Sequence, residues 1–78
     1  MLKKKLSLIL TFSTTTQAMA VEKFCHQQGL PGRLIPVPRE ITAGCGLSWK
    51  AQPEEQDLLI SALTEAGMKW AECHILEV

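Results

Sequence analysis

Three cysteines are the residues of this sequence most able to do chemistry, and Cys45 is the best placed of them. It stands between Gly44 and Gly46, and such small neighbours leave a thiol open to approach and let backbone amides turn toward an anion. A thiol reacts as its thiolate, so positive surroundings must lower its pKa from about 8.5. Arg39 and the positive end of a neighbouring helix are candidates for that role. The pattern predicts a nucleophilic or sulfur-carrying thiol.

The same segment also has a purely structural interpretation. Gly44 and Gly46 would then serve a tight turn, and Cys45 would be a small packing residue at the start of a strand. Arg39 and Glu40 would form an ordinary solvated ion pair. The residue types alone leave both interpretations open.

The other two cysteines offer less. Cys25 shares the apolar side of an expected helix with Phe24, which predicts a core position. Cys73 adjoins His74, but neighbours on a strand point to opposite faces and make a poor pair of ligands for one metal. The sequence has no CxxC motif, so we expect neither a metal nor a cofactor. Cys73 as a second thiol that resolves Cys45 remains an alternative to simple packing or exposure.

Size and composition limit the possible classes. The chain has 78 residues, is 46% hydrophobic, and carries 8 basic and 8 acidic side chains. That length predicts a single domain, residues 1–78, and a zero net charge gives no field to attract nucleic acid or anionic lipid. Three scattered cysteines cannot all pair with one another and are unlike a disulfide framework, which indicates the reducing cytoplasm. No apolar run approaches the length of a membrane-spanning helix.

The first twenty residues imitate a secretory signal, with lysines at 3–5, an apolar stretch at 6–12 and Ala18-Met19-Ala20 as a cleavage pattern with small residues on either side of Met19. The apolar stretch is short, however, and it alternates with Ser7 and Thr11 as a strand would. Thr14 to Gln17 then has the spacing of a capping box. We therefore expect a strand followed by a helix that belongs to the folded domain.

Periodicity along the chain after the first strand predicts five elements, beginning with this helix. A helix over 15–28 ends at Gly29, and an extended segment over 34–38 contains Pro36 and Pro38. A strand over 47–50, a helix from Pro53 to 66 and a last strand from 70 to 78 follow. The order is strand, helix, strand, strand, helix, strand. It predicts an α+β fold of ferredoxin-like, split βαβ type, with an antiparallel four-stranded sheet and two helices on one face.

This topology makes a prediction about strand order. Right-handed crossovers place the strands in the order fourth, first, third, second, with the proline-containing strand at an edge where missing N–H groups are tolerated. They also bring the turn after the first strand, the start of the first helix and the loop holding Cys45 to one end of the sheet.

Several segments resemble the selenium/sulfur carrier-like family. They are Leu10 to Thr14, Ala18 and Glu22, the run from Arg33 to Ile41, and Gly44 to Leu47. The resemblance spans nearly the whole chain, and the loop segment is its most specific part. It implies that residues 1–20 belong to the domain. It also implies a carrier whose Cys45 holds sulfur or selenium as a persulfide or selenosulfide and passes it to a partner, with Arg39 and Glu40 organising the loop or facing that partner.

The expected function is thus a carrier with donor and acceptor proteins as partners, rather than a stand-alone enzyme. The alternative is a non-catalytic interaction or regulatory module whose open sheet face or edge pairs with another protein or with a copy of itself, as a homodimer. An RNA-binding version of the fold ranks last, because stacking aromatics on the central strands and a basic face are missing.

Overall fold

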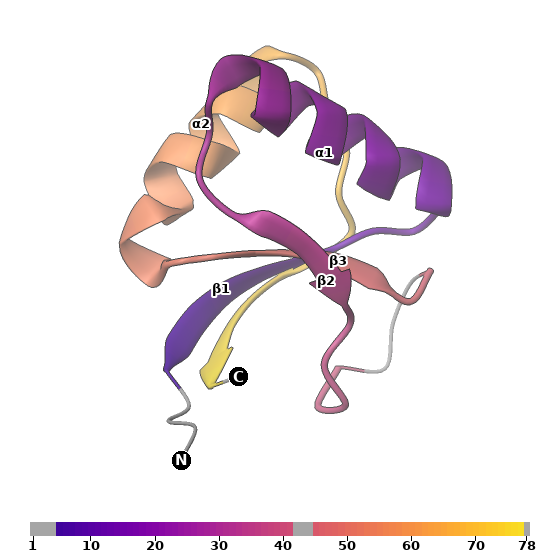
Figure 1. Cartoon of the computed structure of the whole chain (residues 1–78), viewed down its shortest axis with the longest axis vertical. Coiled ribbons are helices and arrows are strands. Elements are labelled where there is room, and N and C mark those ends of the chain that lie inside the picture. Colours follow the sequence, from indigo (N-terminus) through magenta and orange to yellow (C-terminus); the bar gives the residue numbers. More distant parts are fainter. Residues whose placement is uncertain (1–4, 42–44, 78) are drawn as a thin grey trace.

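The structure is a computed structural model that describes residues 5–41 and 45–77. Four strands form one sheet, and two helices lie together over one of its faces (Figure 1). The elements follow in the order β1 (Leu6–Thr11), α1 (Thr15–Gln28), β2 (Arg33–Pro36), β3 (Leu47–Ala51), the 3-10 turn η1 (Pro53–Glu55), α2 (Gln56–Glu65) and β4 (Cys73–Glu77). The predicted α+β class, with a ferredoxin-like arrangement, is confirmed.

The sheet order is β2-β3-β1-β4, and each neighbouring pair is antiparallel. This is the predicted order, and β2 occupies an edge as its prolines require. Pro36 ends β2, which pairs with β3 alone, so the missing N–H falls where no second strand needs it. β2 is shorter than the expected segment, although Val37 still donates its N–H to the Gly46 carbonyl at 2.9 Å.

The main core lies between the sheet and the helices. Leu8 pairs with Ala51 and Leu10 pairs with Trp49, which puts alternate residues of the two central strands under the helices. The helices contribute the positions that recur at helical spacing, whereas Ala66, the last residue of the predicted second helix, is exposed and follows the end of α2. The buried cluster is made of Leu8, Leu10, Phe12, Ala18, Val21, Cys25, Trp49, Ala51, Leu59 and Leu63.

The helix-free face of the sheet is also buried along its centre. Ile9, Thr11 and Ser48 have no exposed surface, although no helix covers them. The chain after β2 lies on this side of the sheet in Figure 1, and Ile41 within it is 6% exposed. The polar residues that alternate with apolar ones in β1 are therefore not exposed to solvent.

Both ends of α1 follow the sequence prediction. The Thr14 hydroxyl accepts the Gln17 N–H at 3.1 Å, and the Gln17 side chain accepts the Ser13 N–H at 2.9 Å, one residue earlier than in a standard capping box. Gly29 closes the helix in the left-handed region with φ 65°. The second helix differs from its prediction, because Pro53 begins the short turn η1 and α2 starts only at Gln56. The last strand likewise begins later than expected, at Cys73.

Candidate functional site

Cys45 lies half-buried on the turn that leads into β3. Its N–H donates to the Phe12 carbonyl at 3.1 Å, which fixes the backbone of the turn against the end of β1. Its side chain packs against the edge of the main core, and its Sγ lies 3.9 Å from the Leu47 carbonyl, at the long limit for a thiol hydrogen bond. Cys45 is thus held by the fold and is only partly buried.

The glycine after this thiol has a conformational reason to be glycine. Gly46 has φ 88°, which a residue with a side chain adopts only with strain, and the position of its absent Cβ meets open space. Its carbonyl accepts the N–H of Val37, so the turn is bonded on both sides, to β1 and to the chain after β2. Gly44, the other predicted glycine, lies outside the described residues.

The predicted meeting of this turn with the start of α1 is visible in the hydrogen bonding. Phe12, which accepts the Cys45 N–H, stands two residues before Thr14, the N-cap of α1. Arg39 and Glu40 are exposed, and within residues 5–41 and 45–77 neither forms an ion pair. The influence of Arg39 on the thiol therefore stays a prediction.

Cys25 is a core residue, as predicted. It has no exposed surface on α1, and burial raises the pKa of its thiol to about 11. A thiol that is both covered and protonated is inert at neutral pH.

Cys73 lies at the opposite side of β1 from Cys45. It pairs with Leu10 through β4, whereas Cys45 joins the β3 side of the same strand. Cys73 is exposed, its Sγ accepts a hydrogen bond from the Gln56 amide at 3.5 Å, and desolvation raises the pKa of its thiol. All three cysteines are free thiols.

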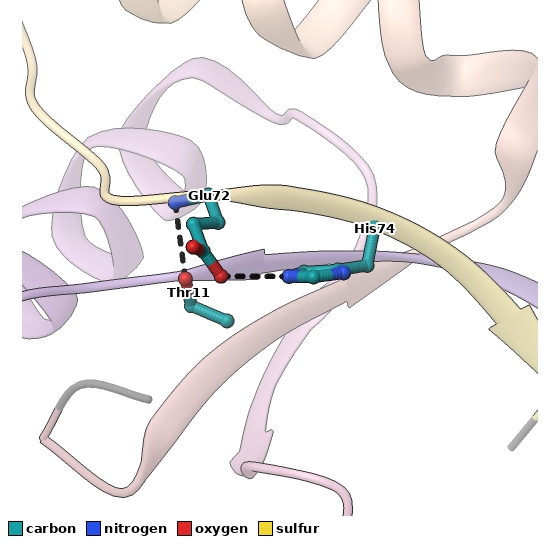
Figure 2. Close-up of polar contacts among 3 residues, drawn as sticks. All are labelled: Thr11, Glu72 and His74. Atoms are coloured by element: carbon teal, nitrogen blue, oxygen red, sulfur yellow. Dashed lines mark hydrogen bonds and ion pairs between the residues drawn. The ribbon is translucent and has the colours of Figure 1, made fainter. Parts of the chain in front are cut away.

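Sequence reasoning missed one polar cluster, on the helix-free face (Figure 2). The Thr11 hydroxyl accepts the Glu72 N–H at 3.0 Å, and Glu72 Oε1 lies 2.9 Å from His74 Nε2. Glu72 and His74 are two residues apart on an extended segment, so the sequence could have predicted that they share a face. It could not have predicted their contact with Thr11, which is 61 residues from Glu72. The cluster holds the start of β4 against β1. His74 lies on the opposite face of β4 from Cys73, so His74 does not activate that thiol.

A surface groove lies at the other end of the sheet. Its volume is about 1050 Å³, and Lys5, Arg33 and Lys50 are among the side chains that line it. None of the cysteines borders it. Among the described residues, no group of three His, Cys, Asp or Glu side chains is placed to hold a metal ion.

Comparison with known protein families finds a match over most of the chain. The family described as "Putative Se/S carrier protein-like" matches residues 7–75. The chain belongs to this family. The matched range runs from β1 into β4 and includes the Cys45 turn.

Membership of the carrier-like family suggests donor and acceptor proteins as partners. Neither among curated proteins nor among solved structures does any match the chain significantly. In the part of the chain that the structure describes, no helix has both the length and the apolar character needed to cross a bilayer.

Proposed function

We propose that this protein is a sulfur or selenium carrier that relays one atom on Cys45, as a persulfide or selenosulfide. The observation that carries the proposal is the position of Cys45: half-buried, on a turn bonded to Phe12 after β1 and to Val37 after β2, in a family described as carrier-like. A relay needs a thiol that is reachable yet held in one place, and this position meets both needs.

The transfer step needs no cofactor. The Cys45 thiolate attacks the terminal sulfur of a donor persulfide, a new sulfur–sulfur bond forms, and the old bond breaks. The donor leaves as its thiolate, and the terminal sulfur, with its proton, now ends a persulfide on Cys45. An acceptor thiolate repeats the exchange, so two-electron balance is kept at each step. Selenium follows the same route from a donor perselenide.

The other two cysteines are less suited to this step. Cys25 is covered by the core and its raised pKa keeps it protonated. Cys73 is accessible, but desolvation also favours its protonated form, and it sits on the far side of β1. Cys45 is therefore the carrier thiol in this proposal, with Gly44 and Gly46 leaving it reachable and Arg39 as the nearby cation of the loop.

The carrier acts stoichiometrically, with one atom per chain and the chemistry shared with its partners. A donor enzyme loads Cys45 and an acceptor protein unloads it, which suits the reducing cytoplasm where free thiols persist. A persulfide on this partly exposed turn can enter a partner's active site, because the two sequence neighbours of Cys45 are glycines and add no side chains beside it.

The test is sulfur loading followed by mass measurement. The protein is incubated with a cysteine desulfurase and cysteine, and separately with a low-molecular-weight persulfide, and is then alkylated and mapped by peptide mass spectrometry. We expect the mass of one added sulfur on the peptide containing Cys45.

Two matched variants give the control. Cys45→Ser should lose the loading while Cys73→Ser, which removes the other accessible thiol, should keep it. Loading that persists in Cys45→Ser, or that maps to the Cys73 peptide, contradicts the proposal.

A second candidate function rests on the free edge at β4. An interaction module would bind its partner through the sheet and would be indifferent to Cys45. It predicts that Cys45→Ser leaves all partner binding unchanged, whereas the carrier proposal predicts loss of the persulfide on Cys45 and of sulfur transfer to the acceptor.

A further inference from the structure

The two edge strands of the sheet differ in their proline content. β2 ends with Pro36 and is followed by Pro38, residues that cannot donate to an added strand. β4, at the other edge, contains no proline, and it pairs only with β1. Proteins usually guard a free edge against pairing with another chain, and here proline guards only one of the two.

The direction of the free backbone groups on β4 follows from the hydrogen bonding. The Thr11 N–H donates to the Glu72 carbonyl at 2.9 Å, so Glu72, His74 and Leu76 direct their backbone groups toward β1. The N–H and carbonyl groups of Cys73, Ile75 and Glu77 consequently point away from the sheet. Within residues 5–41 and 45–77, no loop or helix bonds to them.

Apolar side chains accompany this open edge. Ile75 is 43% exposed and Leu6 is 58% exposed. Ile75 pairs with Leu8, and Leu6 stands two residues before Leu8, so both lie on the helix-facing side of the sheet and are diagonal neighbours. They remain uncovered because the helices do not reach this corner.

We infer that β4 pairs antiparallel with β4 of a second copy of this chain, which gives a two-fold dimer with one continuous eight-stranded sheet. The axis passes through Ile75, the middle residue of Cys73–Glu77. Ile75 then stands opposite Ile75 of the second copy, and each donates its N–H to the carbonyl of the other. Cys73 bonds with Glu77 of the second copy in the same way at each end of the pairing.

The self-pairing is chemically complementary as well as geometrically possible. Its centre joins two apolar side chains, and His74 faces Leu76 of the second copy on the other side of the sheet. Glu77 faces Cys73 of the second copy, so no two like charges stand opposite each other along the strand. A strand from an unrelated protein has no such reason to match, which is why a second copy is the occupant.

The dimer goes beyond the carrier proposal and does not depend on it. Cys45 lies on the β3 side of β1, away from β4, and stays accessible in the dimer. Cys73, in contrast, becomes part of the interface. Because five residues per chain make a small contact, dimerisation should depend on protein concentration.

Sedimentation of the full chain over a range of concentrations tests the inference. We expect a reversible monomer–dimer equilibrium. Ile75→Pro should abolish the dimer without unfolding the monomer, because the N–H that it removes points away from β1. Ile75→Lys is a second variant with the same expected result should the proline perturb β4. Met19→Lys, at an apolar residue of α1 that is 57% exposed, should leave the dimer intact.

Cross-linking tests the register itself. In a Cys45→Ser, Cys73→Ser background, Ile75→Cys should form an interchain disulfide under mild oxidation, because paired Cα atoms at the axis lie about 5.5 Å apart. Glu77→Cys in that background should not, because the two copies of this position are about 13 Å apart along the strands. A wild-type protein that stays monomeric at every concentration overturns the inference, as does a dimer that survives both Ile75 variants or cross-links through position 77.

Discussion

The relative reactivity of Cys45 and Cys25 can be worked out from the structure before any donor is known. The experiment is a short pulse of an alkylating reagent on the folded protein at pH 8, in a Cys73→Ser background so that two thiols compete. Burial raises the pKa of Cys25 from 9.0 to about 11. At pH 8 this leaves about one Cys25 in a thousand as thiolate, compared with about one in ten for the unburied group, a loss of about 100-fold.

Access favours Cys45 in the same direction. Cys25 has no exposed surface, so a reagent reaches it only when α1 opens locally, whereas Cys45 is half-exposed in the folded state. We therefore expect Cys45 to be alkylated more than about 100-fold faster than Cys25. Peptide mass spectrometry at several pulse lengths measures both rates in one sample.

Urea supplies the internal control for this comparison. Above the unfolding midpoint the two thiols should react at similar rates, because unfolding removes both the burial of Cys25 and the pKa shift that this burial causes. The reasoning is refuted if native Cys25 reacts within about tenfold of Cys45, or if unfolding leaves their ratio unchanged.

Two further predictions concern stability. The folded protein keeps the Cys25 proton between pH 9.0 and about 11 whereas the unfolded chain releases it, so the free energy of unfolding should fall through that window by up to about 3 kcal/mol. Urea unfolding at pH 8 and pH 11 should show a smaller fall for Cys25→Ala than for the wild type. Equal falls in the two proteins would contradict this role of Cys25. Gly32→Ala should cost about 3 kcal/mol or more, because φ is 113° and its Cβ would lie 2.6 Å from the Lys50 carbonyl and collide with the Trp49 ring. Gly29→Ala, at φ 65° with no atom within 4 Å, should cost only about 1 kcal/mol, and equal midpoints for the two variants would show that the collision is absent.

Most of the fold could be predicted from local sequence patterns together with the rule that crossover connections are right-handed. The helix at 15–28 follows from its cap, its apolar spacing and Gly29, and each of these acts within one or two turns. The strand order follows because right-handed crossovers admit few alternatives, and the prolines of β2 fit only an edge. The start of α2 was less predictable, because Pro53 is equally suited to the first residue of a 3-10 turn.

The candidate site could be predicted in part. Glycine neighbours drew attention to Cys45, and topology placed its turn near the start of α1, which the Cys45 to Phe12 hydrogen bond supports. The relation between Cys45 and Cys73 could not be predicted, since it depends on which residue of β4 stands opposite Leu10. A shift of one residue would turn Cys73 to the other face, and no turn or cap near β4 fixes that choice.

By itself the sequence determined the type and order of the four strands and the two α-helices, the absence of proline from β4 and the glycines that flank Cys45. These properties depend on backbone conformations and apolar periods that neighbouring residues impose on one another. Only the tertiary structure decided the burial of Ile9 without a helix above it, the fastening of Glu72 to Thr11, and the outward direction of the Ile75 backbone. Each of these depends on hydrogen-bond register between strands that are far apart in the chain, and register is set by the packing of the whole sheet rather than by any local segment.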